Sequence, residues 1–227
     1  MHDLERMKIF YESRKKDTWS IFNCYPYWLD CKQTRMLTKI LNFSNLEKNT
    51  LLDIGAGEGN FLFKMLSLGI EYKNITAIEY LENRYKKLVK KLPHIKSIND
   101  NFLRVELEEK YDIVTLMAVL TSITDNEIRY AILDKGLKSM SSNGMLILYD
   151  YFDNNEKFLN DDYRALSLSK VEELAKEYHI QVYKNVYIKS KYAKGLCKLR
   201  LQSLIPFIES LKIFNDAYHF VVIKNAG

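Results

Sequence analysis

Three of the eight glycines in this 227-residue chain fall within five positions, at Gly55, Gly57 and Gly59. An apolar run that ends at Asp53 precedes them, and an apolar helical pattern follows them. Glycine lets the backbone reverse sharply and come close to a ligand, because no Cβ stands in the way. Glu79 ends the next apolar run, 20 residues past Gly59, where a carboxylate can accept hydrogen bonds from ribose hydroxyls. The spacing predicts a nucleoside-binding site; the alternative is a tight turn without a ligand.

The spacing within the glycine loop indicates which kind of nucleoside it would hold. The dinucleotide fingerprint is GxGxxG, with a helix N-terminus directed at a pyrophosphate. The pattern here is DxGxGxG, and the acidic side chain of Glu58 stands in the turn. A carboxylate at that point would repel a pyrophosphate, whereas a cationic ligand would tolerate it. We therefore expect a positively charged nucleoside rather than a dinucleotide.

This glycine loop resembles that of the class I S-adenosylmethionine-dependent methyltransferases, and the resemblance covers about residues 51–152. It implies that Asp53 and the loop hold the methionine part of the cofactor and that Glu79 binds the ribose hydroxyls. The residues it implies at the cofactor are Asp53, Gly55, Ala56, Gly57, Glu79, Tyr80, Asp100, Asn101, Met117 and Ala118. For Asp100 and Asn101, which the resemblance places at the adenine amine, the alternative is an ordinary polar turn.

The acceptor side of the predicted site follows the fourth and fifth strands. Residues 120–123 lack the Asn/Asp-Pro-Pro-aromatic sequence shared by amine-directed nucleic-acid methyltransferases, and no cysteine stands there for a covalent route to cytosine C5. Residues 149–155 are dense in hydrogen-bonding groups, and Asp150 is the candidate general base. The alternative for Asp150 is a carboxylate that bonds local amides or caps a helix. The candidate acceptor-binding residues are Tyr151, Asn154 and Asn155.

A narrower resemblance concerns the N-terminal segment. Residues 10–14 and 19–23, the Tyr-Asp…Asn-Asn stretch at 149–155 and an apolar insertion before the last strand resemble a methyltransferase subgroup encoded in bacterial surface-polysaccharide clusters. The resemblance implies a sugar hydroxyl as acceptor, and a lid in which Tyr11 and Arg14 approach the cofactor carboxylate. The alternative is that both side chains merely lie on an amphipathic helix.

The predicted function is thus O-methylation of a sugar hydroxyl in polysaccharide biosynthesis, with S-adenosylmethionine as cofactor. Two other hypotheses remain open. One is a methyltransferase that acts on RNA or protein. The other is a non-catalytic binding module that keeps the cofactor fold.

Short apolar runs alternate with amphipathic stretches from about residue 49 onward, which is typical of a doubly wound α/β fold. We expect a Rossmann-like sheet of seven strands, mostly parallel with an antiparallel last strand. The expected strands cover residues 50–54, 74–79, 95–98, 111–119 and 145–149, and the expected helices cover 60–68, 82–92, 126–140 and about 169–178. Ser169 is the expected cap of the last helix, and residues 142–144 are expected to form a turn.

Two further segments, residues 180–188 and 217–224, alternate in polarity like antiparallel edge strands. We expect residues 1–45 to form a helical lid, and residues 46–227 to form the methyltransferase domain with a helical insertion at about 192–214.

The net charge of +5, from 34 basic and 29 acidic residues, is too small to demand a polyanionic partner. Two basic stretches stand out, at residues 84–91 and 184–200. The first is expected to be a solvated helix face. The second can contact a phosphate, an anionic glycan, a membrane surface or a glycosyltransferase, and the alternative is a solvated edge strand.

Three cysteines without CxxC spacing, no metal-ligand spacing, and four histidines outside the predicted site loops argue against a metal centre. No window approaches 18 consecutive apolar residues. We therefore expect a cytoplasmic protein that uses no metal.

Overall fold

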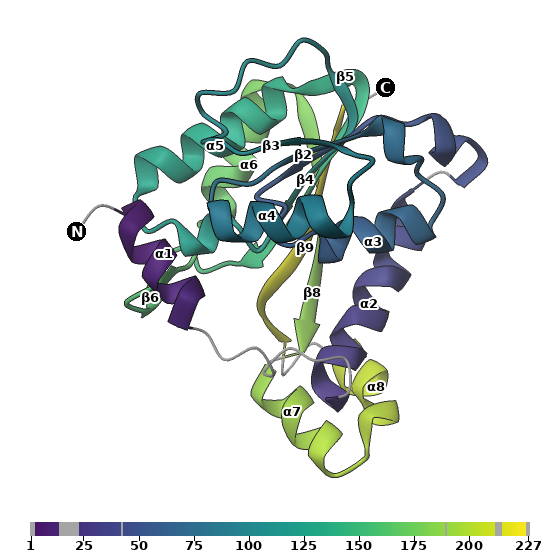
Figure 1. Ribbon diagram of the computed structural model, residues 1–227. Helices are drawn as coiled ribbons and strands as arrows, with labels where there is room; N and C mark the ends of the chain where they lie inside the picture. Colours follow the sequence, from purple (N-terminus) through teal and green to yellow (C-terminus); the bar gives the residue numbers. More distant parts are fainter. Residues whose placement is uncertain (1–2, 14–22, 42, 189, 212–214, 226–227) are drawn as a thin grey trace.

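The computed structural model describes residues 3–13, 23–41, 43–188, 190–211 and 215–225. A seven-stranded sheet in the order β3-β2-β1-β4-β5-β9-β8 forms its centre (Figure 1). The strands from β3 to β5 are parallel, and β9 is antiparallel to both of its neighbours. This architecture confirms the predicted fold class. The strands of the sheet are β1 (Leu51–Ile54), β2 (Ile75–Ile78), β3 (Lys96–Ile98), β4 (Tyr111–Met117), β5 (Met140–Tyr151), β8 (Ile180–Ile188) and β9 (Asn215–Asn225).

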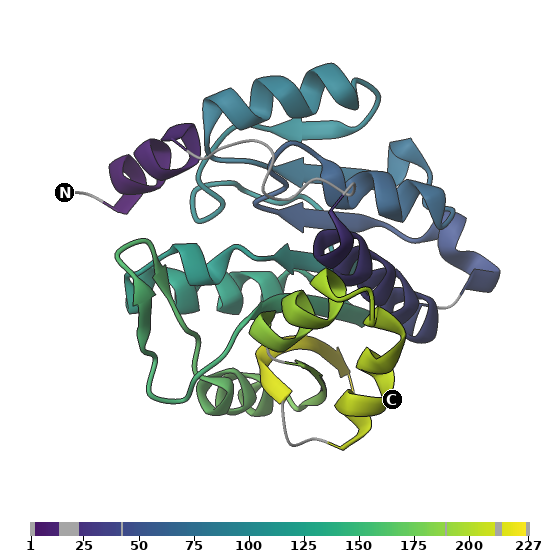
Figure 2. The same ribbon diagram turned by 90° about the horizontal axis from the view of Figure 1, so that it is seen from below.

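Helices cover both faces of the sheet (Figures 1 and 2). On one face α5 and α6 pack over a buried apolar cluster, and on the other α2, α3 and α4 pack over a second one. The α-helices are α1 (Asp3–Ser13), α2 (Cys24–Ile40), α3 (Asn60–Ser67), α4 (Glu82–Lys91), α5 (Asn126–Lys138), α6 (Leu168–Glu177), α7 (Ser190–Lys198) and α8 (Ile205–Ser210). Single-turn helices at Phe43–Lys48, Tyr72–Asn74, Leu120–Ser122 and Gln202–Leu204, and a hairpin of β6 (Phe158–Asn160) and β7 (Tyr163–Arg164), complete the fold.

The central strands are buried on both faces, which explains their nearly continuous apolar sequences. Leu52 and Ile54 of β1 face the cluster under α5, whereas Leu51 faces the cluster under α3. Capping fixes the start of α5, because the Asp125 carboxylate accepts the backbone N–H groups of Glu127 and Ile128. In this part of the chain, the apolar runs therefore form the buried strands, and a capping side chain marks the start of the helix.

Three expectations about the second half are wrong in detail. Residues 142–144 lie within β5, at a shift of register, and glycine is needed there because a Cβ on Gly144 would lie 2.8 Å from the Tyr111 carbonyl oxygen. The cap of α6 is Ser167, whose hydroxyl accepts the Lys170 N–H. Finally, β9 lies between β5 and β8 rather than at an edge, and its consecutive buried residues at 221–223 fit that inner position.

The N-terminal helices lie apart from each other. α1 lies near the β6–β7 hairpin, whereas α2 packs against α7 of the segment between β8 and β9 (Figures 1 and 2). A small apolar cluster of Ala193, Cys197 and Ile205 joins this segment to Tyr25 and Trp28 of α2. Within the described part of the chain, none of the helices combines the length and the apolar character needed to cross a membrane.

Candidate active site

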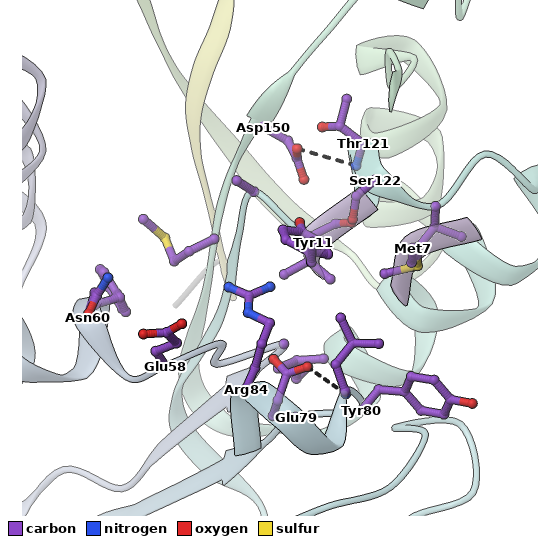
Figure 3. A pocket seen from close by; sticks show the side chains of 18 of the residues that line it. Met7, Tyr11, Glu58, Asn60, Glu79, Tyr80, Arg84, Thr121, Ser122 and Asp150 are labelled. Carbon is purple, nitrogen blue, oxygen red and sulfur yellow. Dashed lines mark hydrogen bonds between the residues drawn. The ribbon is translucent and has the colours of Figure 1, made fainter. Parts of the chain in front are cut away.

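A cavity of about 1740 Å³ opens at the carboxyl ends of β1, β2, β4 and β5, with α1, α2 and α4 around it (Figure 3). A pocket for one small ligand is usually about 300–1,000 Å³, so this cavity has room for two. Ten of the site residues expected from the sequence line this cavity: Tyr11, Gly55, Glu79, Tyr80, Asp100, Asn101, Met117, Ala118, Asp150 and Tyr151. The topology thus brings together residues from six segments that lie far apart in the sequence.

The glycine loop needs glycine for conformation and for space. Gly55, Gly57 and Gly59 all have positive φ, at 72°, 62° and 82°. A Cβ on Gly55 would lie 2.7 Å from the Val119 side chain, which is too close for any other residue. The N–H groups of Gly55 and Ala56 donate to the Ile78 carbonyl at 2.8 and 3.0 Å. These bonds hold the loop against the end of β2.

Asp53 lies buried beneath this loop and does not itself line the cavity. One oxygen, Oδ1, accepts a hydrogen bond from the Thr115 hydroxyl at 2.7 Å, and Oδ2 has no hydrogen-bond partner among the described residues. Burial raises the pKa of Asp53 to about 7; the Thr115 hydroxyl lowers it and the negative charge of Glu79 raises it. A buried carboxylate with an unused oxygen favours a cationic group nearby.

Glu79 connects the glycine loop to the segment after β2. Its Oε2 accepts the Gly57 N–H and its Oε1 accepts the Leu81 N–H, both at 2.7 Å. The Asn99 amide donates to the carbonyl oxygens of Glu79 and Tyr80, which fixes the same corner from β3. Each carboxylate oxygen carries two lone pairs, so both retain capacity for a ligand hydroxyl.

Glu58 does not present an uncompensated negative charge. Its carboxylate forms ion pairs with Lys87 at 2.7 Å and Lys91 at 3.0 Å on α4. Burial alone would raise the pKa of Glu58, but the two lysines outweigh burial and lower it. Repulsion between Glu58 and a pyrophosphate is therefore weaker than the sequence suggests, because two ammonium groups compensate the carboxylate charge.

Asp150 ends β5 and lines the cavity, and it also bonds local amides. Its carboxylate accepts the N–H of Leu120 at 2.9 Å and the N–H of Thr121 at 3.3 Å (Figure 3). Burial raises the pKa of Asp150 to about 7, although the backbone N–H groups act in the opposite direction. The carboxylate thus holds the loop after β4 and presents a weakly acidic group to the cavity at the same time.

The backbone at the end of β4 is strained next to the cavity. Ala118 has a φ of 57°, a left-handed conformation that costs an L-residue about 1–2 kcal/mol. Its N–H donates to the Tyr149 carbonyl at 2.7 Å, which holds the conformation in place. The strain exposes Ala118 and the side chain of Met117 to the cavity.

The polar turn after β3 also reaches the cavity. The Asp100 carboxylate accepts the Asn101 N–H at 2.6 Å, and the Asn101 side-chain oxygen accepts the Leu103 N–H at 3.0 Å. Both side chains therefore stabilise a turn, as the alternative for them expects, and both line the cavity.

The structure does not bring Asn154 and Asn155 to the cavity. The Asn154 side chain accepts the Ser169 N–H at 3.3 Å, and the Asn155 N–H donates to Asp153. Both asparagines are exposed and lie outside the cavity lining, whereas Tyr151 is part of it.

Sequence reasoning missed several side chains that shape the site. They are Arg84, Asn99, Thr115, Thr121 and Ser122. Thr115 is found only through strand register, since it pairs with Asp53 across β1 and β4. Thr121 and Ser122 follow β4 and were considered only for the nucleic-acid motif that they lack.

α1 contributes Tyr11 to the cavity and is held there by contacts of Tyr11, Arg6, Phe10 and Met7. The Arg84 guanidinium lies 4.4 Å from the Tyr11 ring centroid, in the geometry of a cation–π contact (Figure 3). Arg6 forms an ion pair with Asp162 at 3.1 Å and donates to the Ser122 carbonyl oxygen at 2.8 Å. Arg14, the other residue assigned to the lid, lies outside the described residues.

Replacing Tyr11 by alanine is expected to weaken the binding of the expected cofactor, S-adenosylmethionine, by up to about two- to thirtyfold, because the cation–π contact with Arg84 that holds α1 at the cavity contributes about 0.5–2 kcal/mol. Tyr11→Phe keeps the ring and is the matched control. Isothermal titration calorimetry of both variants measures the difference. Equal affinities for Tyr11→Ala and Tyr11→Phe would show that the ring plays no part in ligand binding.

The basic stretch predicted at residues 84–91 is mostly compensated. Lys86 pairs with Glu82, Lys87 and Lys91 pair with Glu58, and Arg84 contacts Tyr11. In the stretch at 184–200 the structure describes the side chains of residues 192–200, of which Lys194, Lys198 and Arg200 are exposed. No group of histidine, cysteine and acidic side chains suited to a metal ion occurs among the described residues.

Comparison with known proteins agrees with this geometry. The sequence profile of the family described as "Methyltransferase domain" matches residues 28–195. No curated protein matches the chain. Among solved structures, the N-methyltransferase NodS from Bradyrhizobium japonicum WM9, in complex with S-adenosylhomocysteine, is 12% identical with a TM-score of 0.67, and the match covers 100% of both chains.

Two further solved structures share the fold. The plantazolicin methyltransferase BamL, in complex with a desmethyl analogue and S-adenosylhomocysteine, is 18% identical over 99% of this chain and 96% of its own, with a TM-score of 0.61. The magnesium protoporphyrin IX methyltransferase ChlM from Synechocystis PCC 6803, with bound S-adenosylmethionine, is 11% identical over 100% and 98%, with a TM-score of 0.62. At these identities the likeness concerns the fold.

Proposed function

The chain belongs to the methyltransferase domain family, and on that premise we propose that it transfers a methyl group from S-adenosylmethionine to a sugar hydroxyl in the synthesis of a surface polysaccharide. The observation that carries the proposal is a pair of buried carboxyl groups at the same end of the sheet: Asp53 lies beneath the glycine loop, and Asp150, at the end of β5, lines the cavity. The first suits a cationic cofactor. The second suits an acceptor that must lose a proton.

The residues around the glycine loop fit S-adenosylmethionine. Gly55 and Gly57 let the loop lie close to the Val119 and Arg84 side chains, where a Cβ would clash, and the buried Asp53 carboxylate beneath the loop supplies negative charge that would attract the ammonium group of the methionine part. Glu79 can accept the ribose hydroxyls on its remaining lone pairs. Asp100 and Asn101 would bind the adenine amine, and Tyr80, Met117 and Ala118, which also line the cavity, would contact the cofactor when it is bound. When bound, the cofactor supplies a sulfonium-activated methyl group.

The acceptor side performs alignment and proton removal. A sugar hydroxyl is a weak nucleophile, and transfer to it requires oxygen, methyl and sulfur in line and a base for the proton. Asp150 lines the cavity, and its pKa of about 7 lets it be ionised at neutral pH and still bind a proton effectively. Tyr151 and Thr121 flank it and can bind further hydroxyls of the acceptor. α1 and α2 border the cavity.

Asp150→Asn is expected to lower the rate of methyl transfer about a hundredfold or more, because a general base typically contributes about 10²- to 10⁴-fold to the rate. In the wild type, the rate at saturating cofactor is expected to rise with pH through about 7 and then level off. That rise is expected to disappear in Asp150→Asn. Asp153→Asn, a change at an acid of the same stretch outside the cavity, is the matched control.

The measurement is mass spectrometry of a one-methyl gain on a panel of monosaccharides and sugar nucleotides incubated with S-adenosylmethionine. An unchanged pH profile in Asp150→Asn would remove the base assignment. Methyl incorporation into RNA that ribonuclease destroys, with no gain on any sugar, would overturn the sugar proposal. If the purified protein bound no S-adenosylmethionine even at millimolar concentration, it would be a binding module instead.

A further inference from the structure

The segment between β8 and β9 exposes an unusual amount of apolar surface. Leu199 and Phe207 are 68% and 66% exposed, the two highest values among the large apolar side chains that the structure describes. Five exposed apolar residues between positions 199 and 211 form what we call the insertion surface: Leu199, Leu201, Leu204, Phe207 and Leu211. Scattered apolar residues on a surface are ordinary, but a concentration of this kind marks an interaction site.

The insertion surface belongs to a well-packed part of the molecule. On the opposite side of the same helices, Ala193, Cys197 and Ile205 are buried against α2. An ion pair between Lys32 of α2 and Glu209 of α8 adds a polar contact. The outward apolar side chains therefore belong to helices that are packed against α2, and their exposure does not come from fraying of a chain end.

Helical spacing places the apolar side chains on one side. Leu204, Phe207 and Leu211 are three and four positions apart around α8, so they share a face. Leu199 and Leu201 follow the end of α7, which is fixed by a hydrogen bond from the Leu201 N–H to the Leu196 carbonyl at 2.8 Å. α7 and α8 project from the rest of the molecule at the end away from β3 and α5 (Figure 1).

Positive charge borders the apolar side chains. Lys194, Lys198 and Arg200 are exposed on the same segment, and Glu209, which pairs with Lys32, is its one acidic residue between positions 192 and 211. Lys198 and Arg200 form no ion pair with any residue that the structure describes. Leucine and phenylalanine next to lysine and arginine are the composition of segments that lie in the interface of anionic membranes.

We propose that the insertion surface docks the protein onto an anionic lipid bilayer, with Leu199, Leu204 and Phe207 in the headgroup region and Lys198 and Arg200 on the lipid phosphates. A second copy of the chain is a poorer occupant, because it would bring the same three positive charges against the first set. α2 supports the insertion surface and also lines the cavity with Tyr25, Pro26 and Leu29. Docking would therefore leave α2 and the segment between β8 and β9 between the cavity and the bilayer.

The proposal is tested by flotation of the full-length protein with vesicles. Wild type is expected to bind vesicles of phosphatidylcholine and phosphatidylglycerol and not vesicles of phosphatidylcholine alone. Binding is expected to weaken in about 0.5 M salt, where screening removes the charge contribution. The same result with the protein saturated with S-adenosylmethionine keeps this test separate from the proposed function.

Two variants address the two kinds of contact. Leu204→Ser/Phe207→Ser/Leu211→Ser removes exposed apolar side chains, and Lys198→Glu/Arg200→Glu reverses two charges; each is expected to weaken vesicle binding about tenfold or more. The controls are Phe63→Ser/Tyr183→Ser and Lys90→Glu/Lys176→Glu, which change two exposed aromatic residues and two exposed lysines elsewhere. Melting temperature and affinity for S-adenosylmethionine are expected to stay the same in all four variants.

The proposal is overturned if the wild type does not float with phosphatidylglycerol vesicles, or if both insertion variants bind them as the wild type does. Sedimentation equilibrium checks the other occupant. A wild-type dimer that the triple serine variant abolishes, together with absent vesicle binding, would assign the surface to a second copy of the chain.

Discussion

Replacing Glu79 by alanine is expected to raise the dissociation constant for S-adenosylmethionine about a hundredfold or more. The change removes the carboxylate proposed for the ribose hydroxyls, and hydrogen bonds to a charged group contribute about 1.5–3 kcal/mol each. It also removes the acceptor for the N–H groups of Gly57 and Leu81, so the glycine loop keeps only its backbone hydrogen bonds to Ile78 at the end of β2. The variant is therefore expected to lose both cofactor affinity and the conformation of the glycine loop.

The same variant is expected to fold with a lower melting temperature. Each buried N–H group left without an acceptor costs about 1–3 kcal/mol, and 1 kcal/mol corresponds to about 2–4 °C in a chain of this size. Calorimetric titration measures the affinity, and circular dichroism measures the melting temperature. Glu79→Gln keeps the volume of the side chain and Glu71→Ala removes an exposed acid just before the same strand, so these are the controls. Wild-type affinity in Glu79→Ala would remove the ribose assignment.

Asp53→Asn is expected to stabilise the cofactor-free protein above about pH 7 and to weaken cofactor binding about ten- to a hundredfold. Asp53 has a pKa of about 7 in the folded chain and an ordinary value of 3.8 when exposed. Below pH 3.8 both states hold the proton. As the pH rises from 3.8 to 7, the unfolded chain loses the proton first, so the free energy of unfolding falls; above about 7 the loss is complete.

The difference between those pKa values corresponds to about 4 kcal/mol. In Asp53→Asn, the amide NH₂ group at the position of Oδ2 would have no hydrogen-bond partner, and this lowers the gain in stability by about 1–3 kcal/mol. The net expectation is a gain of about 1–3 kcal/mol near pH 8 that shrinks as the pH falls and becomes a loss of about 1–3 kcal/mol near pH 4, where the burial penalty is absent and the cost of the amide remains. Asp150 titrates in the same range in both proteins, so its contribution cancels in the comparison.

Urea unfolding at several pH values measures this dependence. Asp112→Asn is a control of opposite sign: burial would raise the pKa of Asp112, but hydrogen bonds from Thr50 and Ser141 outweigh burial and lower it. Asp112 therefore stabilises the fold above its ordinary pKa of 3.8, and Asp112→Asn is expected to be less stable at neutral pH. Identical pH curves for Asp53→Asn and wild type would show that Asp53 carries no burial penalty.

The first half of the domain could be predicted closely because its signals are local. β1, α3, β2 and α4 each begin and end within about two residues of the expected positions, since apolar period and strand length decide them. The glycine loop was identified from spacing alone, and its three positive φ angles are the physical reason for that spacing. The turn expected at residues 142–144 was wrong because register depends on pairing with the distant strand β4, and the cap expected at Ser169 was wrong because Ser167, two residues earlier, accepts the Lys170 N–H.

The sequence by itself determined the order of strands and helices along the chain, the glycine loop and the acid at the end of β2. Each of these depends on residues close together in the chain. Only the tertiary structure decided which charges are compensated. α4 places Lys87 and Lys91 on Glu58, and β4 places Thr115 on one oxygen of Asp53 while the other stays without a described partner. Electrostatic energy depends on distance and burial, and neither is fixed until the strands pair and the helices pack.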